Sequence, residues 1–88
     1  MPKTLDVVLD PADNERLANL CGALDENLRQ IETAYDISIS RRGEHFALRG
    51  HPAQAVLAHK ALRHFYDQAD DHLTVDDIQL GLVELASL

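Results

Sequence analysis

The fold of this chain is decided between residues 20 and 32, which read Leu20-Cys21-Gly22-Ala23-Leu24-Asp25-Glu26-Asn27-Leu28-Arg29-Gln30-Ile31-Glu32. Gly22 predicts the end of one helix, because glycine adopts the left-handed conformation that closes a helix at little cost. Asp25 is a typical N-cap residue and predicts the start of a second helix. Leu28 and Ile31 continue that helix at apolar spacings of three. The stretch therefore predicts two helices joined by a tight turn.

The segment before this stretch predicts a strand and the first helix. Residues 4–10 alternate in the manner of a half-buried strand. Asp10 is placed to cap a helix, and Pro11 suits the first turn, where its missing N–H costs nothing. The expected buried face of this helix consists of Leu17, Leu20 and Cys21.

The segment after this stretch returns to a period of two. Residues 36–41 and 44–49 predict two strands, and Arg42-Gly43 predicts the tight turn between them. The side chains expected to meet on the core side are Ile37, Ile39, Phe46 and Leu48.

Two more helices are expected. Pro52 opens a long helix that runs to about residue 69, with an inner face of Ala55, Leu57 or Ala58, Ala61, Leu62 and Phe65. Thr74 and Asp77 predict a capping box ahead of a last helix, whose apolar stripe is Val75, Ile78, Leu82 and Leu85.

The element order predicts one α+β domain over residues 1–88, with a three-stranded sheet and helices packed on one of its faces. A chain of this length buries roughly 60–65% of its unfolded surface, which supports a modest core.

The net charge of −7 is unevenly distributed. Residues 27–64 carry six basic and three acidic side chains, whereas residues 65–88 carry six acidic and no basic ones. Such polarity matters more for the choice of partner than the net value.

Composition and spacing argue against several classes of function. No apolar run is long enough for a membrane span, and the N-terminus lacks a signal-peptide core, so we expect a cytoplasmic protein without a membrane partner. The lone Cys21 agrees with a reducing compartment. The five histidines lack ligand spacing, and no nucleophile has a recognisable base partner, so we expect neither a metal or other cofactor nor catalysis by these residues.

The turn between the first two helices resembles the loop of type I KH domains, which have the order β-α-α-β-β-α. Those domains carry a hydrophobic-Gly-x-x-Gly loop, with apolar positions three and six residues beyond the second glycine. Gly22 matches the first glycine, Asp25 replaces the second, and Leu28 and Ile31 match the apolar positions. The resemblance implies a KH-like fold with an additional C-terminal helix.

A second resemblance covers nearly the whole chain and is carried by residues 13–22, 26–32, 41–46 and 49–50. These stretches are similar to the N-terminal, KH-like segment of PhoH-family (phosphate starvation-inducible, PhoH-like) ATPases. This similarity implies a cytoplasmic, ATP-binding protein of RNA metabolism, with a P-loop ATPase domain C-terminal to this one. The chain itself contains no Gly-x-x-x-x-Gly-Lys-Ser/Thr motif.

The resemblance to KH domains implies a single-stranded RNA site at the loop and the hairpin. Asp25 argues against phosphate binding at this loop. A carboxylate that caps a helix N-terminus occupies the backbone N–H groups that would bind a phosphate, and its charge repels the phosphate. RNA contacts then depend on arginines, and the candidate nucleic-acid-binding residues are Gly22, Ala23, Leu24, Asn27, Arg29, Arg41 and Arg42.

The alternative is a degenerate KH scaffold that serves as a protein-interaction or oligomerisation module. The last helix carries more apolar surface than is needed to help cover a three-stranded sheet. Leu80 and Val83 add a second apolar flank to this helix. The expected interaction residues are Ile78, Leu82, Leu85 and the terminal Leu88, facing the chain's own ATPase domain or a second copy.

Overall fold

The computed structural model describes residues 3–87 and confirms the α+β class and the element order. The elements are β1 (Lys3–Val8), α1 (Asn14–Cys21), a 3₁₀ turn (Ala23–Asp25), α2 (Glu26–Tyr35), β2 (Ser38–Arg42), β3 (His45–Gly50), α3 (Pro52–Asp67) and α4 (Val75–Ala86). Leu88 lies outside the described residues.

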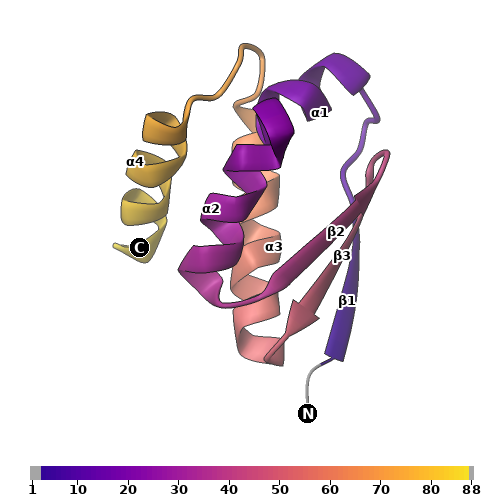
Figure 1. Cartoon of the computed structure of the whole chain (residues 1–88), viewed down its shortest axis with the longest axis vertical. Helices are drawn as coiled ribbons and strands as arrows, with labels where there is room; N and C mark the ends of the chain where they lie inside the picture. Colours follow the sequence, from indigo (N-terminus) through magenta and orange to yellow (C-terminus); the bar gives the residue numbers. More distant parts are fainter. Residues whose placement is uncertain (1–2, 88) are drawn as a thin grey trace.

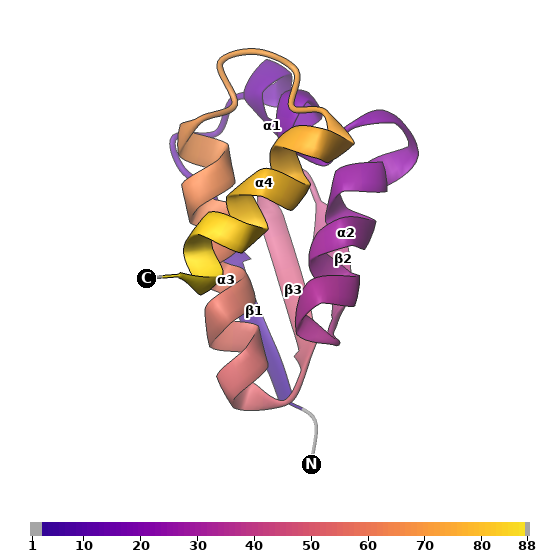
Figure 2. The same cartoon turned by 90° about the vertical axis from the view of Figure 1, so that its left-hand side faces the viewer.

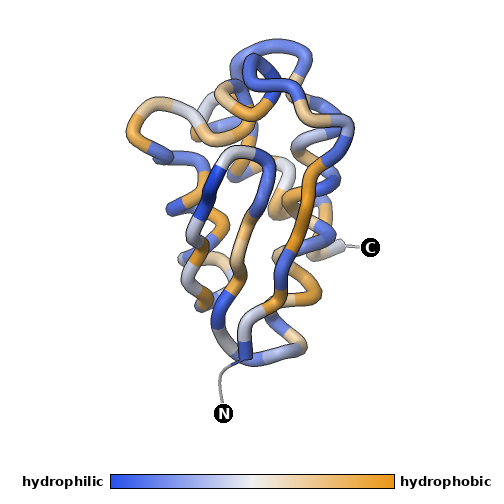
Figure 3. The backbone as a smooth tube through the Cα atoms, turned by 90° about the vertical axis from the view of Figure 1, so that its right-hand side faces the viewer, coloured by the Kyte–Doolittle hydropathy of each residue, from blue (hydrophilic) through white to orange (hydrophobic). Residues whose placement is uncertain are grey.

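The strands form an antiparallel sheet in the order β1-β3-β2, so β3 is central and β2 is an edge strand. The helices α2 and α3 cover one face of the sheet, and α4 packs on α2 and α3 on the side away from the strands (Figures 1 and 2). Within residues 3–87, no helix covers the other face of the sheet (Figure 3). The last helix therefore adds a third layer behind α2 and α3.

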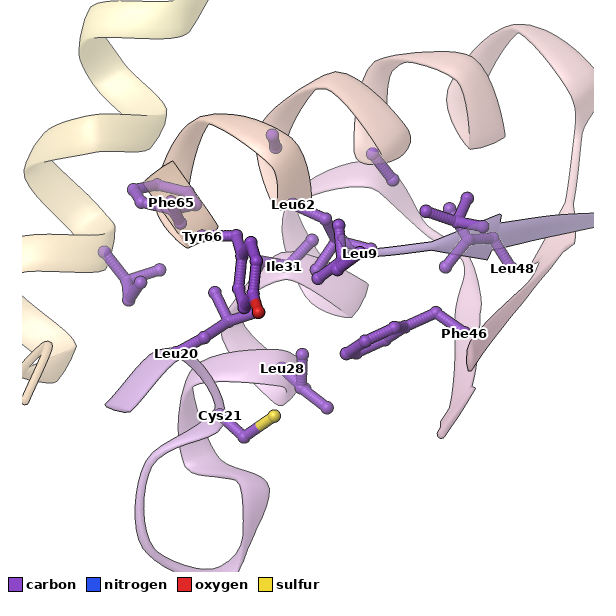
Figure 4. Close-up of a cluster of buried hydrophobic side chains, with 14 of the residues drawn as sticks. Leu9, Leu20, Cys21, Leu28, Ile31, Phe46, Leu48, Leu62, Phe65 and Tyr66 are labelled. Atoms are coloured by element: carbon purple, nitrogen blue, oxygen red, sulfur yellow. The ribbon is translucent and has the colours of Figure 1, made fainter. Parts of the chain in front are cut away.

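The core lies between the sheet and the helices α2 and α3. Phe46 and Leu48 enter it from β3, and Leu62, Phe65 and Tyr66 enter it from α3 (Figure 4). All five side chains are at most 1% exposed. Of the two alternatives for the inner face of the long helix, Ala58 is buried, whereas Leu57 is 45% exposed.

The start of α1 differs from the prediction. Asp13, not Asp10, caps the helix, because its Oδ1 accepts the N–H groups of Glu15 (3.0 Å) and Arg16 (3.1 Å). Pro11 therefore lies in the loop before the helix. The carbonyl oxygen of Asp10 instead accepts a hydrogen bond from Arg63 Nη1 at 2.7 Å, which ties the loop to α3.

The hairpin turn is displaced by one residue from the prediction. The turn residues are Gly43 and Glu44, and Arg42 pairs with His45 at the ends of the two strands. Gly43 has a φ of 61°, which a glycine adopts without strain. Ile39 pairs with Leu48.

The predicted capping box at the start of α4 is confirmed. Thr74 Oγ1 accepts the N–H of Asp77 at 3.1 Å, and Asp77 Oδ2 accepts the N–H of Thr74 at 2.9 Å. Hydrogen bonds to the Asp77 carboxyl from the backbone N–H and from the side chain of Thr74 hold the pKa of that carboxyl below its usual value.

Candidate nucleic-acid interface

The turn between α1 and α2 has an unusual backbone. Gly22 ends α1 with a φ of 75°, as predicted, and Leu24 and Asp25 follow with φ values of 53° and 57°. A Cβ atom at Gly22 would lie 2.9 Å from Asn27 Nδ2, so any larger residue there would collide with α2. Two consecutive non-glycine residues in the left-handed region are rare, and such strain is often found at functional sites.

Asp25 does not cap α2, contrary to the prediction. Its side chain accepts no capping hydrogen bond, because its left-handed backbone is not the extended conformation of a capping residue. The donors at the start of α2 are thus not satisfied by the Asp25 carboxylate. Asp25 stands at the position of the second glycine in the KH pattern, in a left-handed conformation that glycine adopts without strain, and it adds a negative charge.

The candidate residues of the turn have very different exposures. Leu24 is 85% exposed at the tip, Ala23 is also exposed, and Gly22 is half-buried behind them. Asn27 is fully buried, so the prediction that it contacts nucleic acid is wrong. Its Nδ2 instead donates to the carbonyl oxygens of Leu20 (3.0 Å) and Leu73 (2.7 Å), which ties the turn to the α3–α4 loop.

A groove of about 260 Å³ lies between α2 and the edge strand β2. Its lining is Asp25, Leu28, Arg29, Glu32, Ile39 and Arg41. The groove joins the turn through Asp25, and it brings together two of the three predicted arginines, Arg29 and Arg41. Leu28 and Ile39 give it an apolar floor.

The third arginine lies on a different face of the sheet. Side chains alternate along a strand, so Arg41, which pairs with the inward-facing Phe46, lies on the helix side. Arg42, one residue further, pairs with the exposed His45 and lines a broader hollow with Ser40 and Ala47 on the open face. Arg41 also borders this hollow. The groove thus brings together two of the three predicted arginines, and Arg42 lies outside it.

Two acidic side chains share the groove with the arginines. Glu32 Oε2 accepts the N–H of Ile39 at 2.7 Å and so occupies a backbone donor of the edge strand. Asp25 adds a second carboxylate at one end. The groove is close to neutral overall, so a phosphate is attracted only where it approaches Arg29 or Arg41 more closely than the acids.

Cys21 lies near the groove but is not a nucleophile there. Burial raises the pKa of its thiol to about 11, against the opposing field of Arg41. The side chain is 2% exposed, so at neutral pH it is a protonated core residue.

The three predicted interaction residues of the last helix face inward. Ile78 is fully buried, and Leu82 and Leu85 are half-buried against the core. The structure thus corrects the expectation that this stripe is exposed for a partner. The large apolar residues of α4 that are exposed are those of the second flank, Leu80 and Val83, at 62% and 64% exposure.

The described residues show neither a metal-ligand cluster nor a membrane span. Within residues 3–87, no group of three or more His, Cys, Asp or Glu side chains is arranged to hold a metal ion. In the same part of the chain, no helix has the length and apolar character needed to cross a bilayer.

No family model matches the chain. Its fold is similar to that of Dim2p from Pyrococcus horikoshii OT3, with a TM-score of 0.74, 18% identity and coverage of 94% of this chain and 49% of that chain. A chain of the a/eIF2alpha–aDim2p–rRNA complex from the same organism gives a TM-score of 0.72 and 17% identity, covering 99% of this chain and 49% of that one. This chain thus spans about half the length of the structures it matches. These similarities confirm the predicted KH-like fold.

Sequence reasoning missed three residues of the groove. Leu28 was identified only as a core residue, and Glu32 and Ile39 were not considered as site residues. A signal existed for Glu32, which lies one helical turn after Leu28 on the same side of α2. No local signal placed the edge of β2 beside it, because that contact depends on the packing of the helix on the sheet.

Proposed function

We propose that this chain is a non-catalytic, KH-like module that binds single-stranded RNA in the groove between α2 and β2. The observation that carries the proposal is the placement of Arg29 and Arg41 in one groove, from two elements that are not adjacent in sequence. Two guanidinium groups on one groove offer phosphate contacts, and the apolar floor of Leu28 and Ile39 suits an unpaired base or ribose.

The choice of a single strand follows from the size and the charge of the groove. A volume of about 260 Å³ has no room for a duplex, whose recognition needs contacts spread along its grooves. The two carboxylates limit the attraction for a dense array of phosphates. The presence of rRNA in the complex that contains a similar fold supports RNA as the ligand class.

The similarity to PhoH-like proteins suggests the setting in which the module acts. We infer that it positions RNA for a cytoplasmic, PhoH-like P-loop ATPase domain C-terminal to it, and that it needs no cofactor of its own. This inference rests on residues 13–22, 26–32, 41–46 and 49–50. Fusion of the chain to such an ATPase domain should make ATP hydrolysis responsive to RNA, whereas an R29A/R41A fusion should lose that response.

The proposal is tested by fluorescence anisotropy with a short, labelled single-stranded RNA at low and moderate salt. The Arg29→Ala/Arg41→Ala variant should weaken binding by about tenfold or more. It should also reduce the slope of log affinity against log salt by about 1.4, since each lost phosphate contact contributes about 0.7 in a single strand.

The matched control is the Arg42→Ala/Arg49→Ala variant. It removes the same charge, but from the open face of the sheet. Its affinity should stay within about twofold of the parent. Equal losses in both double variants would show that RNA responds to net charge and would contradict a site in the groove.

A further inference from the structure

The outer face of α4 combines exposed apolar side chains with a hollow. Leu80 and Val83 are three residues apart and lie on the side of the helix away from α2 and α3. Next to them, a hollow of about 360 Å³ opens between the end of α3, the loop after it and one side of α4. Its lining includes Leu73, Leu80 and Gly81.

The rim of this hollow is acidic. Asp71, Asp77 and Glu84 line it, and all three side chains are exposed. Asp77 is held by the capping box, whereas Asp71 and Glu84 make no ion pair within residues 3–87. Residues 65–88 contain no lysine or arginine, so His72, which also lines the hollow, is the one basic side chain of that segment near these charges.

We propose that the outer face of α4 docks a cationic segment of a partner protein that carries aliphatic anchors among its lysines or arginines. The aliphatic anchors of the partner pack on Leu80 and Val83. The methylene groups of its lysines or arginines pack on the apolar lining of the hollow, and their charged ends reach the carboxylates. Charge complementarity sets the sign of the partner, and the exposed leucine and valine set its amphipathic character.

Two other occupants fit this face poorly. A second copy related by a two-fold axis would bring the same carboxylates together, since such an interface is self-complementary. RNA would meet charges of its own sign. The face is also separate from the α2–β2 groove, because α4 lies on the far side of α2 and α3 from the sheet (Figures 1 and 2).

The test uses a labelled synthetic peptide with lysines on one helical face and leucines on the other, titrated into the whole chain at moderate salt. The Leu80→Ser/Val83→Ser variant should weaken binding by at least tenfold, and Asp71→Asn/Glu84→Gln should do so by a similar factor. Both pairs are exposed, so the variants are expected to fold, which circular dichroism checks.

Two control variants distinguish binding at the outer face of α4 from nonspecific hydrophobic or electrostatic attraction to the chain. Val56→Ser/Leu57→Ser removes a comparably exposed apolar pair from α3, and Glu15→Gln/Asp36→Asn removes two acids elsewhere; both should bind like the parent. Equal weakening by Glu15→Gln/Asp36→Asn, or no effect of Leu80→Ser/Val83→Ser, would overturn the proposal. Self-association of the parent that Leu80→Ser/Val83→Ser abolishes would also overturn it, in favour of a second copy on this face.

Discussion

At the scale of single residues, Asp25 sets the character of the proposed RNA site. It adopts a φ of 57°, a conformation that glycine tolerates best and aspartate better than most residues. It also places a carboxylate at the mouth of the groove beside Arg29 and Arg41. The same side chain thus lowers both the stability of the turn and the attraction for phosphate.

We therefore predict that Asp25→Gly stabilises the domain by about 1 kcal/mol, because it removes the left-handed strain. Affinity for single-stranded RNA should rise as well, since a negative charge leaves the groove. Chemical denaturation and RNA titration measure the two effects separately.

The Asp25→Asn variant serves as the control for charge. Asparagine removes the negative charge and keeps a side chain suited to positive φ, so it should raise RNA affinity with little change in stability. An unchanged affinity in both variants would show that the groove does not meet the phosphates.

Cys21 gives a prediction in the alkaline range. Burial raises the pKa of its thiol from 9.0 to about 11, so the folded chain keeps a proton that the unfolded chain releases between these values. The contribution is complete below pH 9.0 and is lost as the pH rises toward about 11, which lowers the free energy of unfolding.

Denaturation of the parent and of Cys21→Ala across this range measures the effect. The parent should lose stability more steeply with pH than the variant, which retains Tyr35, the other residue whose pKa burial raises in this range. Parallel curves for the two proteins would contradict a buried, protonated thiol.

At the scale of elements, Gly81 fixes how closely α4 approaches α3. A Cβ atom there would lie 2.3 Å from Cε1 of Phe65, which is 1% exposed and has little room to move. In an open helix, alanine in place of glycine would stabilise by about 1 kcal/mol. Here the collision prevails.

We predict that Gly81→Ala destabilises the domain by about 1–3 kcal/mol, the usual cost of an overpacked core. The double variant Gly81→Ala/Phe65→Leu should be less destabilised than the sum of the single changes, because leucine vacates the space of the ring edge. Denaturant midpoints of the four proteins measure this coupling. Additive losses would mean that Gly81 does not contact Phe65.

Helices and strands could be predicted from the sequence wherever burial on one face determines which positions are apolar. The alternation of residues 44–49 and the spacing of Leu28 and Ile31 arise from which side chains face the core, so they gave the strands and helices. The start of α1 could not be chosen locally, because Asp10 and Asp13 are both suitable caps. What distinguishes them is the hydrogen bond from Arg63 to Asp10, which spans 53 residues.

The site was less predictable than the fold, because it depends on register and on distant contacts. The displacement of the hairpin turn by one residue moves Arg42 from the turn into β2, where alternation places its side chain on the face opposite Arg41. Asn27 resembles a surface residue in sequence, and only its bond to the carbonyl oxygen of Leu73 explains its burial. Neither fact leaves a local pattern.

At the scale of the whole molecule, the charges divide the surface into two regions. The arginine pair borders the groove beside the edge strand, and the acids of the last 24 residues gather around α4 and the loop before it. A net charge of −7 conceals this division. The fold thus presents an RNA-compatible groove and a cation-compatible helix on different faces, as a module that joins two partners requires.

The proposed site for single-stranded RNA is the groove between α2 and β2. Amide chemical-shift mapping with a short single-stranded RNA at low salt, where electrostatic attraction is strongest, tests it most directly. We predict perturbations in the turn of residues 22–25, in α2 around Arg29 and in β2 around Arg41, with the amides of α4 unchanged. Perturbations centred on the open face of the sheet or on α4, or none at all, would contradict the account.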